Sequence, residues 1–309
     1  MIPYNLFIHA ALVFIGSLLL IIYLIPKVIK IVNFKNIMDN PNMRSSHAQA
    51  TPSLGGVAFY FVIIISFYFN QTYDTSSVAI NLIPALTILF FLGLKDDLLV
   101  LDPLKKFIGQ IVASLFILVS TEFEVNSFHG FLFIEHINYW VGIPLSLFAM
   151  LAITNAFNLI DGIDGLAAAL GIVVFSSFTL LFFWAERYFF ALTALTMIGI
   201  LVGFLYFNLS NKKKIFMGDT GSMLIGFMVS AMSVRVLSLD MNSLSKLPFN
   251  PIDIPILLLS FVIMPFLDTT RVIFIRILQR KSPFSADRNH IHHVFIDTLN
   301  ILLLMAILN

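Results

Sequence analysis

Residues 154–166 place two amides and two carboxylates at a regular spacing between two long apolar runs. The four side chains stand three residues apart: Asn155, Asn158, Asp161 and Asp164. On a helix, such positions lie along one slowly drifting face, and Gly162 and Gly165 let the backbone turn beside the last carboxylate. A polar stripe at the edge of a membrane segment is costly unless it faces water, polar partners or a ligand. Oxygen donors of this kind suit Mg²⁺ and the phosphates that it accompanies.

A second acidic pair, Asp96 and Asp97, ends another apolar run and is followed by Lys106. Two adjacent carboxylates in a partly buried site ionise together only when a cation shares the site. Because neighbouring helix residues point about 100° apart, one carboxylate could face a substrate while the other orients a lysine. A solvated loop that happens to carry charge explains the same residues.

Residues 218–222 place Asp219 between two glycines where a further apolar run begins. A helix that starts here would offer backbone N–H groups to an anion, and the carboxylate to the metal of that anion. The three lysines at 212–214 are better explained as an anchor at the cytoplasmic membrane surface.

Two further segments carry polar groups. The last one contains four basic side chains: Arg288, His290, His292 and His293. Their spacing is poor for tetrahedral zinc on one helix, so hydrogen bonding to phosphate is favoured over a zinc site. Near the amino terminus, Ser46 and His47 could contact an anion. Alternatively, this segment only starts a helix, with Thr51 as the cap, Pro52 in the first turn, and Gly55 and Gly56 packing closely.

The elements that position these groups are membrane helices. Hydrophobic residues make up 59% of the 309 residues and charged residues 11%, and the mean hydropathy is +0.96. Ten apolar segments are candidate spans: 6–32, 54–70, 78–94, 107–120, 139–157, 166–184, 189–208, 222–239, 254–277 and 294–308. We therefore predict an all-α polytopic membrane helix bundle with about ten transmembrane helices. No internal repeat is evident, so residues 1–309 are predicted to form one domain.

Lys and Arg gather in the connections that follow the odd-numbered segments. The positive-inside rule therefore places the amino terminus outside and these connections, including the one with the polar stripe, in the cytoplasm. The net charge of +1 gives no sign of nucleic-acid binding, and the absence of Cys excludes disulfides and thiol chemistry.

All of these polar clusters fall on the same predicted side of the membrane. Carboxylates and cations on one face suit a magnesium-bound phosphate substrate, which predicts an enzyme that transfers a phosphoryl group between a soluble donor and a lipid. A secondary transporter is the main alternative, but transporters place substrate groups near the midplane and usually have paired halves. A lipid-phosphate-binding scaffold without turnover would need a defective metal site.

Four motifs, taken in order, resemble those of the polyprenyl-phosphate N-acetylhexosamine-1-phosphate transferase family: 96–97, 155–166, 218–222 and 288–293. The last motif is most similar to the undecaprenyl-phosphate N-acetylglucosamine-1-phosphate transferase branch. The resemblance implies a multi-pass enzyme of the bacterial cytoplasmic membrane, with its active site facing the cytoplasm. It implies that a polyprenyl phosphate attacks a UDP-N-acetylhexosamine, giving lipid-diphospho-sugar and UMP at the start of cell-envelope glycan synthesis. UDP-N-acetylglucosamine is the expected donor, and the N-acetylgalactosamine and muramoyl-pentapeptide donors are the alternatives.

The resemblance also implies roles for individual residues. Asn158 and Asp219 would hold Mg²⁺, with Mn²⁺ as an alternative ion, and Asp96 and Asp97 would lie at the acceptor phosphate as base or orienting group. Substrate contacts are expected from Lys106 to the acceptor, from Asp164 to the uracil, and from Arg288, His290 and His292 to the donor phosphates or sugar. Supporting positions are expected at Asn155, Asp161, His293, Ser46 and His47.

This chain also departs from the family pattern. Gln49, Ala50 and Ser53 stand where family members often carry Lys, Pro and Arg, which weakens any phosphate role for that loop. The sequence leaves open whether the chain forms a homodimer.

Overall fold

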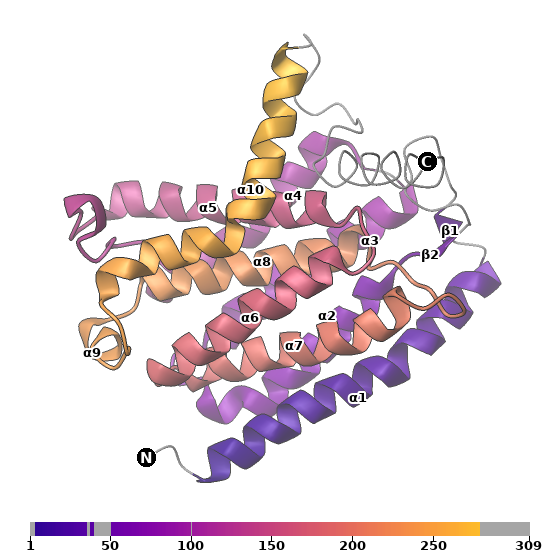
Figure 1. Ribbon diagram of the computed structural model, residues 1–309, viewed down its shortest axis with the longest axis horizontal. Coiled ribbons are helices and arrows are strands. Elements are labelled where there is room, and N and C mark those ends of the chain that lie inside the picture. The colour runs from indigo at the N-terminus through magenta and orange to yellow at the C-terminus, as the bar shows by residue number, and fades with distance from the viewer. Residues whose placement is uncertain (1–3, 36–37, 40–50, 100, 279–309) are drawn as a thin grey trace, which may run out of the picture.

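The computed structural model describes residues 4–35, 38–39, 51–99 and 101–278, and nearly all of these lie in helices (Figure 1). The α-helices are α1 Tyr4–Lys35, α2 Gly55–Asn70, α3 Val78–Leu99, α4 Pro103–Leu118, α5 Tyr139–Ile160, α6 Leu166–Trp184, α7 Tyr188–Asn208, α8 Gly218–Leu237, α9 Met241–Leu244 and α10 Ile254–Leu278. The short elements are strands β1 Met38–Asp39 and β2 Thr51–Pro52, which pair antiparallel, and the 3₁₀ helices η1 Gln71–Tyr73, η2 Thr121–Phe123, η3 Phe131–Phe133 and η4 Pro251–Asp253.

Seven helical segments in the described part of the chain are long and apolar enough to cross a membrane: α1, α2 with η1, α3, α5, α6, α7 and α8. The structure therefore confirms an all-α polytopic membrane protein. Helix α4 stands at a predicted position but has only 16 residues. Helix α10 matches the ninth predicted segment, whereas the tenth, residues 294–308, lies outside the described residues.

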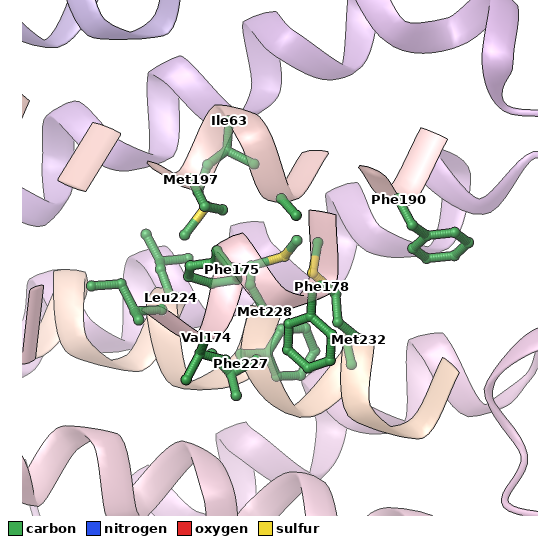
Figure 2. Close-up of a cluster of buried hydrophobic side chains, with 14 of the residues drawn as sticks. Ile63, Val174, Phe175, Phe178, Phe190, Met197, Leu224, Phe227, Met228 and Met232 are labelled. Atoms are coloured by element: carbon green, nitrogen blue, oxygen red, sulfur yellow. The ribbon is translucent and has the colours of Figure 1, made fainter. Parts of the chain in front are cut away.

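Helix α8 forms the centre of the bundle, and all of its residues from Thr220 to Val236 are buried. It packs against α2, α3 and α5, while α7 packs against α1 and α6 (Figure 1). Side chains of α2, α6, α7 and α8 meet in the core, where Ile63, Phe178 and Met197 face Phe227 and Met228 (Figure 2). In lipid, where helices gain little from leaving their apolar surroundings, close van der Waals packing of this kind holds the bundle together.

Glycines let the helices approach closely at one end of α8. A Cβ atom added to Gly56 would lie 2.1 Å from the backbone nitrogen of Gly221, and one added to Gly93 would lie 2.5 Å from the Cα atom of Thr220. The predicted close packing at Gly55 and Gly56 is therefore confirmed. These contacts bring the amino terminus of α8 against α2 and α3.

The predicted cap on α2 is wrong. Thr51 belongs to strand β2, and α2 begins at Gly55 after Leu54, whose φ is 78°. The backbone N–H of Gly55 donates to the carbonyl of Phe216 at 2.9 Å, and that of Gly56 donates to the carbonyl of Met217 at 2.8 Å. A side-chain cap is not needed because main-chain carbonyls already accept from the first turn of the helix.

The far end of α8 is fixed by charge pairs. Arg235, whose relative exposure is only 2%, pairs with Glu122 of η2. Two more exposed pairs lie on this side, Arg187 with Asp240 at 2.6 Å and Lys246 with Glu186 at 2.5 Å. Arg235 lies 16 residues after Asp219 on the same helix, about 24 Å away at 1.5 Å per residue. These groups therefore form a separate end of the molecule.

Candidate active site

Three of the predicted site residues meet around one lysine. Lys106, in the first turns of α4, places its Nζ atom 2.8 Å from Asp96 Oδ2 and 2.8 Å from Asp219 Oδ1. The same atom donates to Asn158 Oδ1 at 3.2 Å. The carboxyl ends of α3 and α5 and the amino ends of α4 and α8 therefore converge here, as the positions of the motifs at helix ends predict.

Asn158 links the last turn of α5 to the first turn of α8. Its amide nitrogen donates to Asp219 Oδ1 at 2.5 Å and to Ser222 Oγ at 2.8 Å. Ser222 in turn donates to the carbonyl of Gly218 at 3.1 Å. The side chains that carry the predicted metal-binding oxygens are thus held by other polar groups, and both oxygens face Lys106.

Asp96 and Asp97 point in different directions, as their adjacent positions on a helix predict. The side chain of Asp96 is only 10% exposed, and its Oδ1 accepts from the backbone N–H of Leu101 at 2.6 Å while Oδ2 faces Lys106. A merely solvated charged loop is therefore the wrong explanation of this pair. Asp96 joins the end of α3 to the lysine of α4.

Asp97 caps α8 from another helix. Its Oδ1 accepts from the backbone N–H of Asp219 at 2.7 Å, and its Oδ2 accepts from the backbone N–H of Thr220 at 3.1 Å and from Thr220 Oγ1 at 2.6 Å. Gly218, with φ at +72°, makes room for this contact, because a Cβ there would lie 2.7 Å from the carboxylate. The expectation that these two N–H groups are open to an anion is therefore wrong: a carboxylate already holds them.

The polar stripe is divided between a helix and a turn. Asn155 and Asn158 lie on the last turns of α5, which ends at Ile160, whereas Asp161 and Asp164 lie in the turn that leads to α6. The prediction of a single helical face is correct for the amides and wrong for the carboxylates. The two halves separate just after α5 ends, at Asp161, which has φ −75° and ψ 44°. Gly165, with φ +79°, a conformation that favours glycine, then starts α6.

Asp161 lies near other acidic groups. Burial, followed by the negative charges of Asp219, Asp97 and Asp164, raises the pKa of Asp161 well above the usual range of an aspartate. The cause is physical: a carboxylate that is removed from water and surrounded by like charge is costly to ionise. A bound cation at this end of the bundle would oppose that effect.

Sequence reasoning missed the groups that hold the turn. Asn208, at the end of α7, accepts from the backbone N–H of Gly165 at 2.6 Å and donates to the carbonyl of Ile215 at 2.9 Å. This amide therefore ties the turn after α5 to the segment before α8. An amide within an otherwise apolar helix was the available signal, because such a buried group requires partners.

Gln110 is a second missed residue. It stands one helical turn after Lys106 and exchanges hydrogen bonds with Asn155: Asn155 Nδ2 donates to Gln110 Oε1 at 2.7 Å, and Gln110 Nε2 donates to Asn155 Oδ1 at 3.3 Å. The expected supporting position of Asn155 is thus a contact between α4 and α5. The signal was the spacing of four residues from Lys106, which puts both side chains on one helix face.

Lys214 has a role beyond the predicted membrane anchor. Its Nζ atom lies 2.5 Å from Asp164 Oδ2 and 5.3 Å from the ring centroid of Phe216. Lys212 and Lys213 are exposed, and the anchor interpretation remains a prediction for them. Asp164, Lys214 and Phe216 therefore lie together.

The remaining predicted residues lie outside the described part of the chain. They are Ser46, His47, Arg288, His290, His292 and His293.

Lys106, Asp96, Asn158 and Asp219 form a lysine-centred cluster, and its oxygen atoms suit a hard cation. Two carboxylate oxygens and one amide oxygen already converge on a single ammonium group, and Mg²⁺ is commonly held by one or two carboxylates together with waters and substrate phosphates. Among the described residues, no group of three or more His, Cys, Asp or Glu side chains is placed to hold a metal. A metal held here would take the amide oxygen of Asn158 beside a carboxylate oxygen of Asp219.

Comparison with known proteins adds an independent finding. The model of the family described as glycosyl transferase family 4 matches residues 79–237, which include every residue of the lysine-centred cluster. The chain is 32% identical over 287 residues to a protein of Bacillus subtilis named probable undecaprenyl-phosphate N-acetylglucosaminyl 1-phosphate transferase, covering 93% of this chain and 77% of that protein.

Two other relatives extend the comparison. The undecaprenyl-phosphate alpha-N-acetylglucosaminyl 1-phosphate transferase of Escherichia coli K12 is 29% identical, with 86% of this chain and 71% of that protein covered. The phospho-N-acetylmuramoyl-pentapeptide-transferase of Listeria monocytogenes is 33% identical, with coverage of 73% and 74%.

Proposed function

We propose a reaction for this chain, which belongs to glycosyl transferase family 4: it transfers N-acetylhexosamine 1-phosphate from a UDP-sugar to undecaprenyl phosphate. UDP-N-acetylglucosamine is the favoured donor, because the relatives named for that sugar match most of this chain. A muramoyl-pentapeptide donor is the second candidate, supported by the similarity to the Listeria protein. The products are undecaprenyl-diphospho-sugar and UMP.

The main support from the structure is the convergence of Asp96, Asn158 and Asp219 on one cation. In the reaction, an oxygen of the acceptor phosphate forms a bond to the β-phosphorus of the donor, and the bond from that phosphorus to the UMP oxygen breaks. Both reactants are anionic, so the site must offset their repulsion. Asn158 and Asp219 would hold Mg²⁺, which would supply positive charge to offset this repulsion.

Asp97 is proposed to position Asp219 and not to act as a base. Both of its carboxylate oxygens accept hydrogen bonds from the first turn of α8. A phosphate group with a second pKa of about 6 is largely dianionic at neutral pH, so the acceptor needs no strong base. The free oxygen of the acceptor can therefore attack directly.

Asp164, Lys214 and Phe216 are proposed to receive the uridine of the donor. The Asp164 carboxylate can accept from the uracil N–H, and the Phe216 ring offers a face on which a base can stack. Lys214 lies within contact distance of both side chains and can exchange its partner for a donor phosphate. From the family resemblance, Arg288, His290 and His292 are proposed to bind donor phosphates or sugar.

The lysine-centred cluster lies at helix ends that the positive-inside rule predicts to face the cytoplasm. A UDP-sugar is soluble, whereas undecaprenyl phosphate has its chain in the bilayer. A site at this surface of a multi-pass protein meets both. We therefore propose the cytoplasmic face of a bacterial inner membrane as the location of the reaction.

The test is UMP release by the purified full chain with undecaprenyl phosphate and Mg²⁺, measured separately with UDP-GlcNAc, UDP-GalNAc and UDP-MurNAc-pentapeptide. We expect turnover with UDP-GlcNAc that requires both lipid and metal, and Asp219→Asn should lower kcat by orders of magnitude. Asp240→Asn is the matched control, because Asp240 lies at the other end of the bundle. Folded protein that releases no UMP with any of these donors would refute the proposal.

A further inference from the structure

The oxygen atoms proposed for the metal already hold a cation of the protein itself. Lys106 Nζ lies 2.8 Å from Asp96 Oδ2, 2.8 Å from Asp219 Oδ1 and 3.2 Å from Asn158 Oδ1. Its side chain is only 16% exposed, so little solvent separates these charges. The ammonium thus satisfies two carboxylates that would otherwise repel each other.

Lys106 and a divalent cation cannot share this position. An Mg²⁺ ion binds oxygen at about 2.0–2.1 Å. If such an ion were bound to Asp219 Oδ1 and Asn158 Oδ1, the ammonium at its present place would lie against it. Two positive charges at that separation repel strongly in a partly dehydrated site.

We propose that Lys106 and the divalent cation exchange at these oxygens, and that the incoming ion releases the lysine ammonium for the acceptor phosphate. This inference rests on the metal site of the proposed function. The exchange requires movement of one side chain only, since a lysine head turns on a flexible four-carbon stem. Asp219 and Asn158 stay in place, because Asp97 holds the backbone of the first and Ser222 holds the amide of the second.

The exchange makes lipid binding depend on the metal. While Lys106 lies between Asp96 and Asp219, the two carboxylates neutralise the charge of its ammonium group and accept its hydrogen bonds. When the divalent ion takes Asp219 Oδ1 and Asn158 Oδ1, Lys106 loses two of its three oxygen partners. Asp96 is then its one remaining partner in this cluster, and the ammonium can turn toward a phosphate. Lys106 can then attract the acceptor phosphate only after the divalent ion has bound. This dependence favours an ordered reaction in which the metal binds before the lipid phosphate.

The first experiment measures Mn²⁺ binding by electron paramagnetic resonance in detergent, without UDP-sugar or lipid, for the wild type, Lys106→Met and Lys246→Met. Lys246 is the matched control because it forms a comparable lysine–carboxylate pair with Glu186, outside the site. We expect Lys106→Met to bind Mn²⁺ with a Kd about ten- to a hundredfold lower, because the ion no longer displaces charge-assisted contacts. Lys246→Met should match the wild type.

An unchanged or higher Kd in Lys106→Met would overturn the exchange while leaving the metal site of the proposed function intact. If neither the wild type nor Lys106→Met binds Mn²⁺, both the proposed metal site and the exchange are refuted. Lys106→Gln, which keeps a polar head without the charge, replaces Lys106→Met if that variant does not fold, and the same lower Kd is expected.

A second measurement follows the lysine itself. Acylation of Lys106 by an amine-reactive ester, quantified by mass spectrometry, should speed up severalfold when Mg²⁺ is added to the wild type. Lys246 serves as the internal reference, and its labelling should not change. A Lys106 labelling rate that is insensitive to saturating Mg²⁺ would contradict release of the ammonium.

Discussion

The substitution Asp97→Asn tests whether Asp97 acts as a helix cap or as a catalytic base. The carboxylate of Asp97 accepts hydrogen bonds from two backbone N–H groups and one hydroxyl at the start of α8, all within 3.1 Å. An asparagine at this place has only one acceptor oxygen, and its NH₂ group would face an N–H donor of the helix. The substitution should therefore disturb the first turn of α8, which includes Asp219.

The size of the effect can be worked out from the hydrogen bonds that Asp97 accepts. In Asp97→Asn with the amide nitrogen in place of Oδ1, the two bonds to Oδ2 lose their charge assistance, which costs about 1–2 kcal/mol together, and the N–H of Asp219 is left without an acceptor, which costs about 1–3 kcal/mol. We expect the free energy of unfolding to fall by about 2–3 kcal/mol, since the site is partly exposed to water. The affinity for Mn²⁺ should fall as well, because Asp219 loses its support.

The assay combines unfolding midpoints in mixed detergent micelles with the pH dependence of kcat/KM. Thr220→Val is the matched control: it removes the hydroxyl contact of 2.6 Å and keeps both backbone contacts, so it should lower the free energy of unfolding by about 1 kcal/mol. For Asp97→Asn we expect a lower midpoint and a pH profile of unchanged shape.

The cap interpretation is refuted by one combination of results. If Asp97→Asn unfolds at the wild-type midpoint, binds Mn²⁺ normally and yet loses both turnover and the acidic limb of the profile, then Asp97 acts as a base. A cap cannot produce that pattern, because its effect passes through the stability of α8.

Three further substitutions test the remaining contacts. Gly56→Ala should cost about 3 kcal/mol or prevent folding, because its Cβ would lie 2.1 Å from the backbone of Gly221; Gly16→Ala, with nothing within 4 Å, is the control, and equal yields of monodisperse protein would contradict this packing. Asn208→Ala should lower the free energy of unfolding by about 2–4 kcal/mol and raise KM for the donor more than KM for the lipid, since two loops lose their shared amide; equal changes in both constants would disprove the selective effect. Asp161→Asn should make the metal-free protein more stable at neutral pH, because the raised pKa of Asp161 means that its ionisation costs stability as pH rises above the ordinary carboxyl range. The advantage should vanish in acid, where the wild-type carboxyl is protonated in both states, and an advantage that is the same at both pH values would contradict it.

The helices and most of the site could be predicted from the sequence because apolar runs and polar motifs are both local features of the chain. Apolar runs of membrane length leave the backbone no alternative to a helix, and each motif stands at the end of such a run. The convergence of Asp96, Asn158 and Asp219 could therefore be predicted as a shared face. Their common contact with Lys106 could not, because it depends on how four helix ends are packed.

The contacts that the sequence did not predict join residues far apart in the chain. Asn208 holds Gly165, which is 43 residues earlier, and Asp97 holds Thr220, which is 123 residues later. Hydrophobic periodicity contains no information about such pairs. Thr51 was predicted to cap α2 because its residue type fits a cap. The N–H groups at the start of α2 donate instead to carbonyls of the segment before α8, which is distant in the sequence. Local propensity was overridden by tertiary contact.

The cap by Asp97 changes what the start of α8 can do for a phosphate. A free helix amino terminus would bind an anion with its N–H groups and its dipole. Here the N–H groups of Asp219 and Thr220 are already given to a carboxylate, and that carboxylate adds negative charge. Phosphates that approach this end must therefore be neutralised by groups other than these two backbone N–H groups. The contact with Asp97 holds the backbone of Asp219 in place, and the proposed metal together with the released ammonium of Lys106 would supply the charge that brings two anions together.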